Sequence, residues 1–207
     1  MIRVDVDGKP VPQGSMSAIP FHRPCPKCQA AGRYCGRHRV CINGREIGAN
    51  VVHDSDEIAS WRSYVALAVK VALKRSGIRA QPAFAVGGVP IGILFRIDRP
   101  KGHYTSRGML SAEGDRNPEP WHKPDADKLV RAILDACGKF GGVDEGLVYT
   151  DDAQVTRVVV AKAWSTPPTS KAGVSIFLDG TLTEIAAAID AAIQLPTSPV
   201  QQAGLFG

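Results

Sequence analysis

The stretch that most constrains the fold of this 207-residue chain is residues 123–154, which read KPDADKLVRAILDACGKFGGVDEGLVYTDDAQ. Pro124 favours an extended residue before it and fits a helix entrance. Asp125 is then the natural N-cap, and Asp127 falls in the first turn. Apolar residues recur at helical spacing until Gly138, which supplies a stop. The sequence therefore predicts an amphipathic helix whose first turn is acidic.

Two pairs of carboxylates bracket this predicted helix: Asp125 and Asp127 at its start, and Asp151 and Asp152 after a short apolar run. Each pair alone has an ordinary explanation, since acids complement the dipole at a helix start and Asp-Asp suits a turn. Clustered carboxylates repel one another when no cation lies between them, and Mg²⁺ prefers carboxylate oxygens. We therefore expect the four side chains to converge in one pocket on one or two Mg²⁺ ions.

The order of these residues resembles the RusA family of Holliday junction resolvases, whose pattern is K-P-D-x-D-N-x-x-K on a helix followed by D-D-x-Q-V. The matching residues are Lys123, Pro124, Asp125, Asp127, Asp151, Asp152, Gln154 and Val155. Two positions depart from the pattern, because Lys128 stands in place of Asn and Arg131 in place of Lys. Both can donate hydrogen bonds to phosphate, but Arg cannot lend a proton as Lys can. Arg131 can therefore replace the family's lysine only as a stabiliser of charge.

The resemblance covers roughly residues 1–178, apart from an insert, and implies an α+β fold with a small mixed sheet flanked by helices. It also implies a homodimer with two active sites, which suits paired cuts in a two-fold symmetric four-way junction. In this hypothesis, bound Mg²⁺ activates a water for attack on the phosphate, and basic side chains stabilise the developing charge. The residues assigned are Asp125, Asp127, Asp152 and Arg131 as catalytic, Asp151 as a further metal ligand, and Lys123 and Lys128 as phosphate contacts.

The insert, residues 24–41, holds four of the five cysteines. In a cytoplasmic protein such cysteines seldom form disulfides, and their spacing is typical of two knuckles around tetrahedral Zn²⁺. The predicted ligands are Cys25, Cys28, Cys35 and His38, with Cys41 as the alternative to His38. We expect this zinc to be structural, and a thiol-rich loop without metal is the alternative.

Charge and its distribution favour a nucleic-acid partner. The net charge of +5 and the pI of about 9.0 are modest. The basic residues, however, cluster in 23–45 and 96–123 around the acidic centre, as suits a metal-dependent enzyme that acts on nucleic acid. Residues 98–122 lack periodicity and are predicted to form a flexible DNA-contacting loop, with a solvated surface loop as the alternative. The predicted DNA contacts are Lys123, Lys128, Lys101, Arg99, Arg107, Arg37 and Arg39.

The remaining elements follow from apolar periodicity and capping patterns. They are a strand at 1–7, a helix at 54–76, a strand at 89–97 with one face on the core, strands at 154–164 and 173–178 that should pair as a hairpin, and a helix at 181–194. The expected organisation is a nuclease domain over 1–180, a C-terminal helix over 181–195 and a flexible tail over 196–207.

The tail contains Gln202, Leu205 and Phe206 in a Q-x-x-L-F pattern similar to peptides that dock into the bacterial sliding clamp. No run is long and apolar enough to cross a membrane, and the N-terminus lacks a signal-peptide pattern, so a cytoplasmic location is expected. Two alternatives to a Holliday junction resolvase remain at this point. One is a nuclease that cuts flaps or forks, and the other is a non-enzymatic, zinc-containing adaptor that binds DNA or the clamp.

Overall fold

The computed structural model describes residues 1–13, 17–24, 41–42, 45–52, 56–138, 146–166 and 170–194. The chain divides into a larger unit, 1–13 with 57–207, and a smaller unit, 14–56. Several predicted sites lie outside the described residues and stay predictions. They are the zinc ligands Cys25, Cys28, Cys35 and His38, the DNA contacts Arg37 and Arg39, and the clamp-binding Gln202, Leu205 and Phe206. Of Cys41 only the backbone is described.

The smaller unit contains a three-stranded antiparallel sheet that was not predicted from the sequence. Its strands are β2 (Ser17–Pro24), β3 (Cys41–Ile42) and β4 (Arg45–Val52), in the order β2-β4-β3. Pro24 pairs with Arg45, and Cys41 pairs with Glu46. The two ends of the cysteine-rich segment are therefore held on either side of the same strand.

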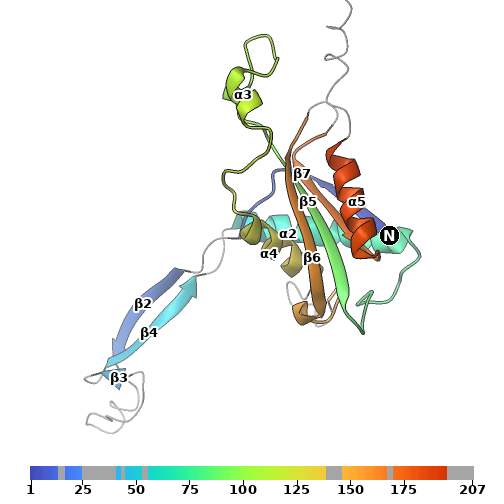
Figure 1. Cartoon of the computed structure of the whole chain (residues 1–207). Coiled ribbons are helices and arrows are strands. Elements are labelled where there is room, and N and C mark those ends of the chain that lie inside the picture. The colour runs from blue at the N-terminus through green and yellow to red at the C-terminus, as the bar shows by residue number, and fades with distance from the viewer. Residues whose placement is uncertain are drawn as a thin grey trace, which may run out of the picture. The chain divides into compact units, whose positions relative to one another are not determined.

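The larger unit is built on a mixed four-stranded sheet in the order β1-β7-β5-β6 (Figure 1). The strands are β1 (Ile2–Asp7), β5 (Val89–Ile97), β6 (Val155–Trp164) and β7 (Gly173–Leu178). Only β5 and β6 run parallel, and β7 is antiparallel to both β1 and β5. A mixed sheet with helices confirms the predicted α+β class.

The predicted hairpin between β6 and β7 is wrong. β7 lies between β1 and β5, with Ile176 opposite both Val4 and Ile93. Every residue of β7 is buried, as suits a central strand, whereas β6 is largely exposed or half-buried and lies at the edge. The chain between β5 and β6 passes through a helix, which is the connection that a parallel pair requires.

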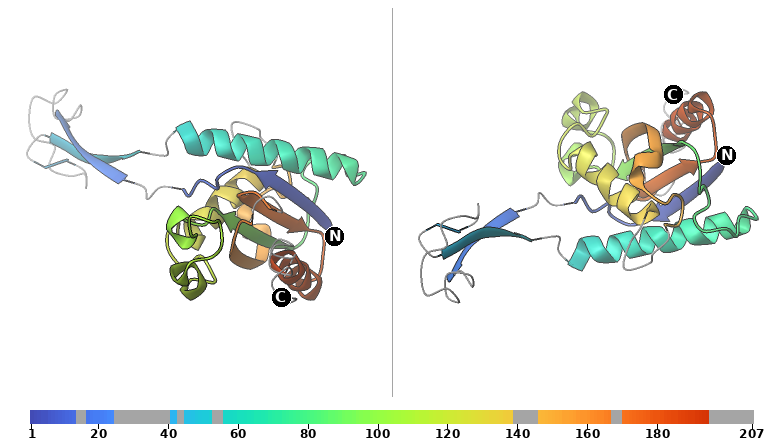
Figure 2. Two further views of the ribbon diagram at one scale, coloured as in Figure 1. Left: turned by 90° about the horizontal axis from the view of Figure 1, so that it is seen from above. Right: turned by 90° about the horizontal axis from the view of Figure 1, so that it is seen from below.

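Helices cover both faces of this sheet (Figure 2). α2 (Asp56–Arg75) and α4 (Ala126–Cys137) pack on one face in the main core, and α5 (Leu182–Ile193) packs on the other. The predicted apolar stripe of α2 is confirmed as buried: Ile58, Trp61, Val65, Val69 and Leu73.

β5 is buried on both faces, rather than on one as predicted. α5 approaches it so closely that a Cβ at Gly92 would collide with Ile185, and Leu94 is buried against the same helix. None of the described helices has the length and apolar character needed to span a membrane.

Candidate active site

The start of α4 presents an acidic side chain that the helix itself does not use. Asp125 is the N-cap, as predicted, and its carbonyl accepts a hydrogen bond from the Leu129 backbone N–H at 3.2 Å. Its side chain makes no capping hydrogen bond. The carboxylate instead forms an ion pair with Lys128, with 3.3 Å between Oδ2 and Nζ. The Asp125 carboxylate is therefore available to a cation that can compete with Lys128.

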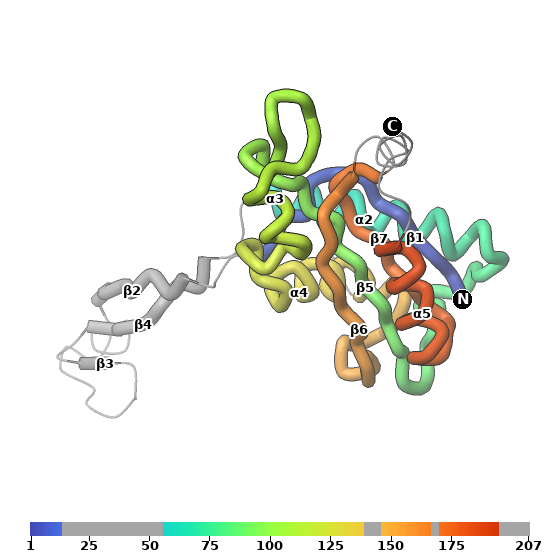
Figure 3. The backbone as a smooth tube through the Cα atoms, turned by 45° about the horizontal axis from the view of Figure 1, so that its top comes forward, coloured from blue at the N-terminus to red at the C-terminus, as the bar shows by residue number. Residues whose placement is uncertain are grey.

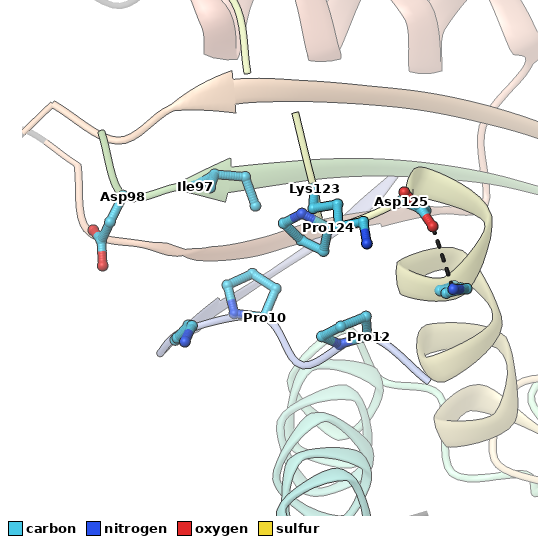
Figure 4. A pocket seen from close by; sticks show the side chains of 9 residues that line it. Pro10, Pro12, Ile97, Asp98, Lys123, Pro124 and Asp125 are labelled. Atoms are coloured by element: carbon cyan, nitrogen blue, oxygen red, sulfur yellow. Dashed lines mark ion pairs between the residues drawn. The ribbon is translucent and has the colours of Figure 1, made fainter. Parts of the chain in front are cut away.

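A pocket of about 450 Å³ opens beside this helix start (Figure 4). The segment after β1, the end of β5 and the start of α4 contribute its walls: Lys9, Pro10, Pro12, Ile97, Asp98, Lys123, Pro124, Asp125 and Lys128. Asp98 and Asp125 lie at opposite ends, with prolines between them. Three lysines beside two carboxylates form a surface that can hold a cation and a phosphate together.

Lys162 on β6 fixes the segment that leads into α4. Its Nζ donates hydrogen bonds to the carbonyls of His122, at 2.9 Å, and Pro124, at 3.2 Å. Both bonds are charge-assisted, a class stronger than neutral hydrogen bonds. Lys162 is therefore a positioning residue for Asp125, although the sequence showed it only as a polar residue within a valine-rich strand.

We expect Lys162→Met to lower the rate of the DNA cleavage that the resemblance implies by about tenfold or more, because small displacements of a reacting group cost large factors in rate. The reason is the loss of both hydrogen bonds that hold the His122–Pro124 backbone. The measurement is single-turnover cleavage together with thermal unfolding. Lys70→Met, at an exposed position of α2, is the matched control and should match the wild type. An unchanged cleavage rate in Lys162→Met would remove the positioning role.

The second acidic pair opens a short turn before β6, named η2 (Asp152–Gln154). Asp151 is its N-cap, and its Oδ1 accepts a hydrogen bond from the Ala153 N–H at 2.8 Å. Gln154 completes a capping box by accepting from the Asp151 N–H at 3.2 Å. Both acids are exposed, but the Asp151 carboxylate is occupied by this turn, so Asp152 is the acid of the pair that has no capping role.

Gln154 also ties this turn to the chain that precedes β5. The two N–H groups of its Nε2 are shared among three backbone carbonyls at 3.2 to 3.3 Å, those of Phe84, Ala85 and Gly87. The glutamine of the D-D-x-Q-V segment is therefore a structural residue. It holds the turn with Asp151 and Asp152 beside the chain that enters β5.

The two acidic pairs lie at opposite ends of the sheet. Asp125 shares its pocket with Ile97, the last residue of β5, whereas Gln154 bonds to Gly87, two residues before β5 begins. A strand of nine residues spans about 30 Å.

The surroundings of Tyr149 give the same placement for Asp152. The Tyr149 hydroxyl donates to the Leu134 carbonyl, late in α4, at 2.6 Å. Burial raises the pKa of Tyr149, and nearby acidic groups, Asp152 among them, raise it further. Asp152 therefore lies near the C-terminal part of α4, whereas Asp125 and Asp127 lie at its N-terminal end.

The prediction that all four carboxylates meet in one pocket of a single chain is therefore wrong. Among the residues with described positions, no three His, Cys, Asp or Glu side chains are close enough together to hold a metal ion. The reason is topological. α4 is the crossover between the parallel strands β5 and β6, so the residues before and after it lie at opposite ends of those strands. The donor chemistry at each end still fits Mg²⁺, because both ends offer exposed carboxylate oxygens.

The basic residues predicted for this site, Arg131, Lys123 and Lys128, all lie at least partly at the surface. Arg131 is exposed and lies one turn after the exposed Asp127, so these two side chains share a helix face. Lys123 is also exposed, and Lys128 is half-buried beside Asp125. Asp135, further along α4, forms an ion pair with Arg62 of α2 at 2.8 Å and belongs to the packing of the two helices.

Residues 98–122 contain regular elements that were not predicted from the sequence, while their contact with DNA stays a prediction. They contain η1 (Lys101–His103) and α3 (Ala112–Arg116), and Tyr104 forms a β-bridge with Leu110. Ser111 caps α3 by accepting from the Gly114 N–H at 3.2 Å. Lack of periodicity did not reveal this order, because capping and side-chain hydrogen bonds maintain it.

The predicted DNA contacts in this segment differ in their availability. Arg99 donates to the Gly114 carbonyl at 2.9 Å, and its guanidinium lies 5.3 Å from the centre of the Trp164 ring. Arg99 is therefore used in holding the segment on β6. Lys101 and Arg107 are exposed and stay available to a polyanion.

The small mixed sheet with its helices defines an α+β protein. The acidic start of α4, with lysines beside it, is a carboxylate site suited to a hard cation. Residues 35–176 match the family described as endodeoxyribonuclease RusA, and the chain belongs to this family. The matched range includes α2, β5, α4 and β6, and with them both acidic pairs. Family membership implies endonuclease activity at Holliday junctions. A search of the curated proteins returned no match.

Proposed function

We propose that this protein is a Mg²⁺-dependent homodimeric endonuclease that resolves Holliday junctions and related branched DNA in recombination and repair. The observation that carries the proposal is the acidic start of α4 in a member of the RusA family. There the Asp125 carboxylate makes no capping hydrogen bond and lines a pocket together with Lys123 and its ion-pair partner Lys128.

Each residue of this surface has a role in the proposed reaction. Asp125 and Asp127 would hold Mg²⁺, which when bound polarises the scissile phosphate and lowers the pKa of the attacking water. Lys128 forms an ion pair with the Asp125 carboxylate and thereby limits repulsion between that carboxylate and the DNA backbone. Arg131, fixed on the same face as Asp127, stabilises negative charge that develops on the phosphate.

We infer that each metal site is completed by a second copy of the chain, because one chain offers its two acidic pairs at opposite ends of the sheet. β6 is one of the two edge strands of the described four-stranded sheet, with β5 as its neighbour (Figure 3). Val158 and Val160 on it are 40% and 36% exposed. An edge strand with exposed valines is a template for pairing with another chain.

Antiparallel pairing of β6 with itself would bring the two acidic pairs together. With the two-fold axis at Val158, residue 154 stands opposite residue 162 of the second chain. The Asp152 turn of one chain then lies at the same end as Lys162 of the other chain, which positions the helix start with Asp125 and Asp127. Two such sites arise by symmetry, as paired cuts in a four-way junction require.

The proposed function is tested by cleavage of synthetic four-way junctions with and without Mg²⁺. We expect symmetric cuts in two opposed strands that depend on Mg²⁺ and are absent with a chelator. Flaps, forks and linear duplex are the comparison substrates. Efficient cutting confined to flaps or forks would favour a different structure-specific nuclease, and absence of any Mg²⁺-dependent cut would favour a non-enzymatic adaptor.

The proposed dimer surface is tested by Val158→Lys, which places two like charges across the two-fold axis. We expect a monomer in analytical ultracentrifugation and loss of junction cleavage. Val86→Lys, at a valine that is 92% exposed in a loop, is the matched control and should remain dimeric and active. A Val158→Lys monomer that cleaves at the wild-type rate would show that a single chain holds a complete site.

We propose two further features for the parts of the chain outside the described residues. One is a structural Zn²⁺ on the cysteine-rich segment, supported by the strands that hold its ends on either side of β4. The fifth cysteine, Cys137, is buried in the core, where burial raises its pKa to about 12, so it does not compete for zinc near neutral pH. The other is docking of the Q-x-x-L-F tail into the sliding clamp.

A further inference from the structure

Two adjacent aromatic side chains, Trp121 and His122, lie immediately before the acidic helix start. Trp121 is 69% exposed. Its ring centre lies 3.5 Å from that of His122, and the two rings are tilted by 33°. A tryptophan side chain normally contributes a large buried apolar area. One that stays mostly in solvent, already backed by a second ring, presents a flat apolar surface without a partner in the described chain.

The Trp121 ring is held in place by hydrogen bonds. Its Nε1 donates to Asn117 Oδ1 at 2.7 Å. Asn117 is only 7% exposed, and its Nδ2 donates to the carbonyl and the carboxylate of Glu113 at 2.8 and 2.9 Å. The Asn117 carbonyl also accepts from Trp164 Nε1 at 2.9 Å. The polar edge of the Trp121 indole is therefore satisfied and directed inward, so its apolar surface is what faces the solvent.

The rings of Trp121 and His122 belong to the same backbone segment that leads into the proposed metal ligands. The His122 carbonyl is one of the two that Lys162 holds, and the other belongs to Pro124. Lys123, between them, lines the pocket with Asp125. A ligand resting on Trp121 would therefore be bound two residues before a cationic side chain, Lys123, and four residues before Asp125, the carboxylate proposed to act on phosphate.

We propose that Trp121, backed by His122, is a stacking platform for a nucleobase that leaves the helical stack at the branch point of the DNA. This inference rests on the proposed function, since it takes branched DNA as the substrate. A flat aromatic surface binds any base, and a nearby lysine contacts the backbone phosphate of the same nucleotide. Bases at a branch are the least costly to unstack, so the platform favours junctions over uninterrupted duplex.

The test compares Trp121→Ala with Trp121→Phe. Both lose the hydrogen bond to Asn117, but only the phenylalanine keeps an aromatic face. We expect the alanine variant to bind a four-way junction about 5- to 150-fold more weakly, the range found for removal of one base-stacking side chain. The phenylalanine variant should recover most of the affinity, and binding to linear duplex should be nearly the same for all three proteins. Fluorescence anisotropy without Mg²⁺ gives these affinities, since no strand is cut.

A second readout reports on the base itself. Permanganate oxidises thymines that are unstacked, so a thymine at the branch point should change its reactivity when the wild type binds and not when Trp121→Ala binds. Equal junction affinity in the wild type and the alanine variant would overturn the inference, and so would equal losses on junction and duplex. A change of oligomeric state in Trp121→Ala would also overturn it, by assigning the ring to a contact between chains. If the wild type binds junctions with this thymine signature but never cuts them, the proposed function fails while the platform stands.

Discussion

Mixing two inactive variants, Asp127→Asn and Asp152→Asn, is expected to restore DNA cleavage that neither shows alone. If each site takes Asp127 from one chain and Asp152 from the other, a mixed dimer contains one site with both changes and one site with neither. Random exchange makes half of the dimers mixed, so about a quarter of the wild-type sites return. The product should be a nicked junction, because each mixed dimer has a single intact site.

Denaturing gels that separate nicked from fully resolved junctions provide the measurement, after exchange of subunits or co-expression of the two variants. Asp125→Asn mixed with Asp127→Asn is the matched control, because every site in that mixture lacks one ligand from the helix start and no activity should return. If mixed dimers of Asp127→Asn and Asp152→Asn form but stay inactive, the two-chain site is wrong and each chain must supply its own ligands.

The Asp127→Asn variant alone is expected to lose cleavage by about 10³-fold or more, because removal of a metal ligand sacrifices several kcal/mol of transition-state stabilisation. Junction binding should be unchanged or tighter, since the substitution removes a negative charge that faces the phosphates. Folding should be little affected, because Asp127 is exposed and a charge at a helix N-terminus contributes only about 0.3–1 kcal/mol.

Single-turnover cleavage with Mg²⁺ and anisotropy binding without it separate these two effects. Asp190→Asn, an exposed aspartate on α5, is the matched control and should cleave normally. Cleavage by Asp127→Asn at a rate near that of the wild type would exclude this carboxylate from the metal site. Weaker binding together with retained cleavage would instead assign Asp127 to DNA contact.

Local patterns in the sequence predicted local structure well. The capping box at Thr181 and Glu184 is present, with Glu184 accepting from the Thr181 N–H at 2.8 Å and Thr181 accepting from the Glu184 N–H at 3.3 Å. The acidic N-cap of α4 and the buried stripe of α2 were predicted in the same way. In each case the determining interactions join residues three or four apart, so the sequence carries them directly.

Contacts between distant residues were not predictable in this way. Alternation of apolar residues indicated that 154–164 and 173–178 are strands, but it did not say which strand each would pair with. Adjacency in sequence favoured a hairpin, whereas the structure places β7 between β1 and β5. Lys162 likewise gave no signal of its role, since its two carbonyl acceptors lie about forty residues earlier in the chain.

The sequence by itself determined the class of fold, the helix that begins with Asp125 and Asp127, and the family to which the chain belongs. Only the tertiary structure decided where these two aspartates lie relative to Asp151 and Asp152. A helix that connects two parallel strands must return along the sheet, so residues at its two ends are separated by the length of a strand. That geometry, which no spacing in the sequence expresses, places one acidic pair at each end of β5 and β6, and it is the reason for our proposal that a second chain completes the metal site.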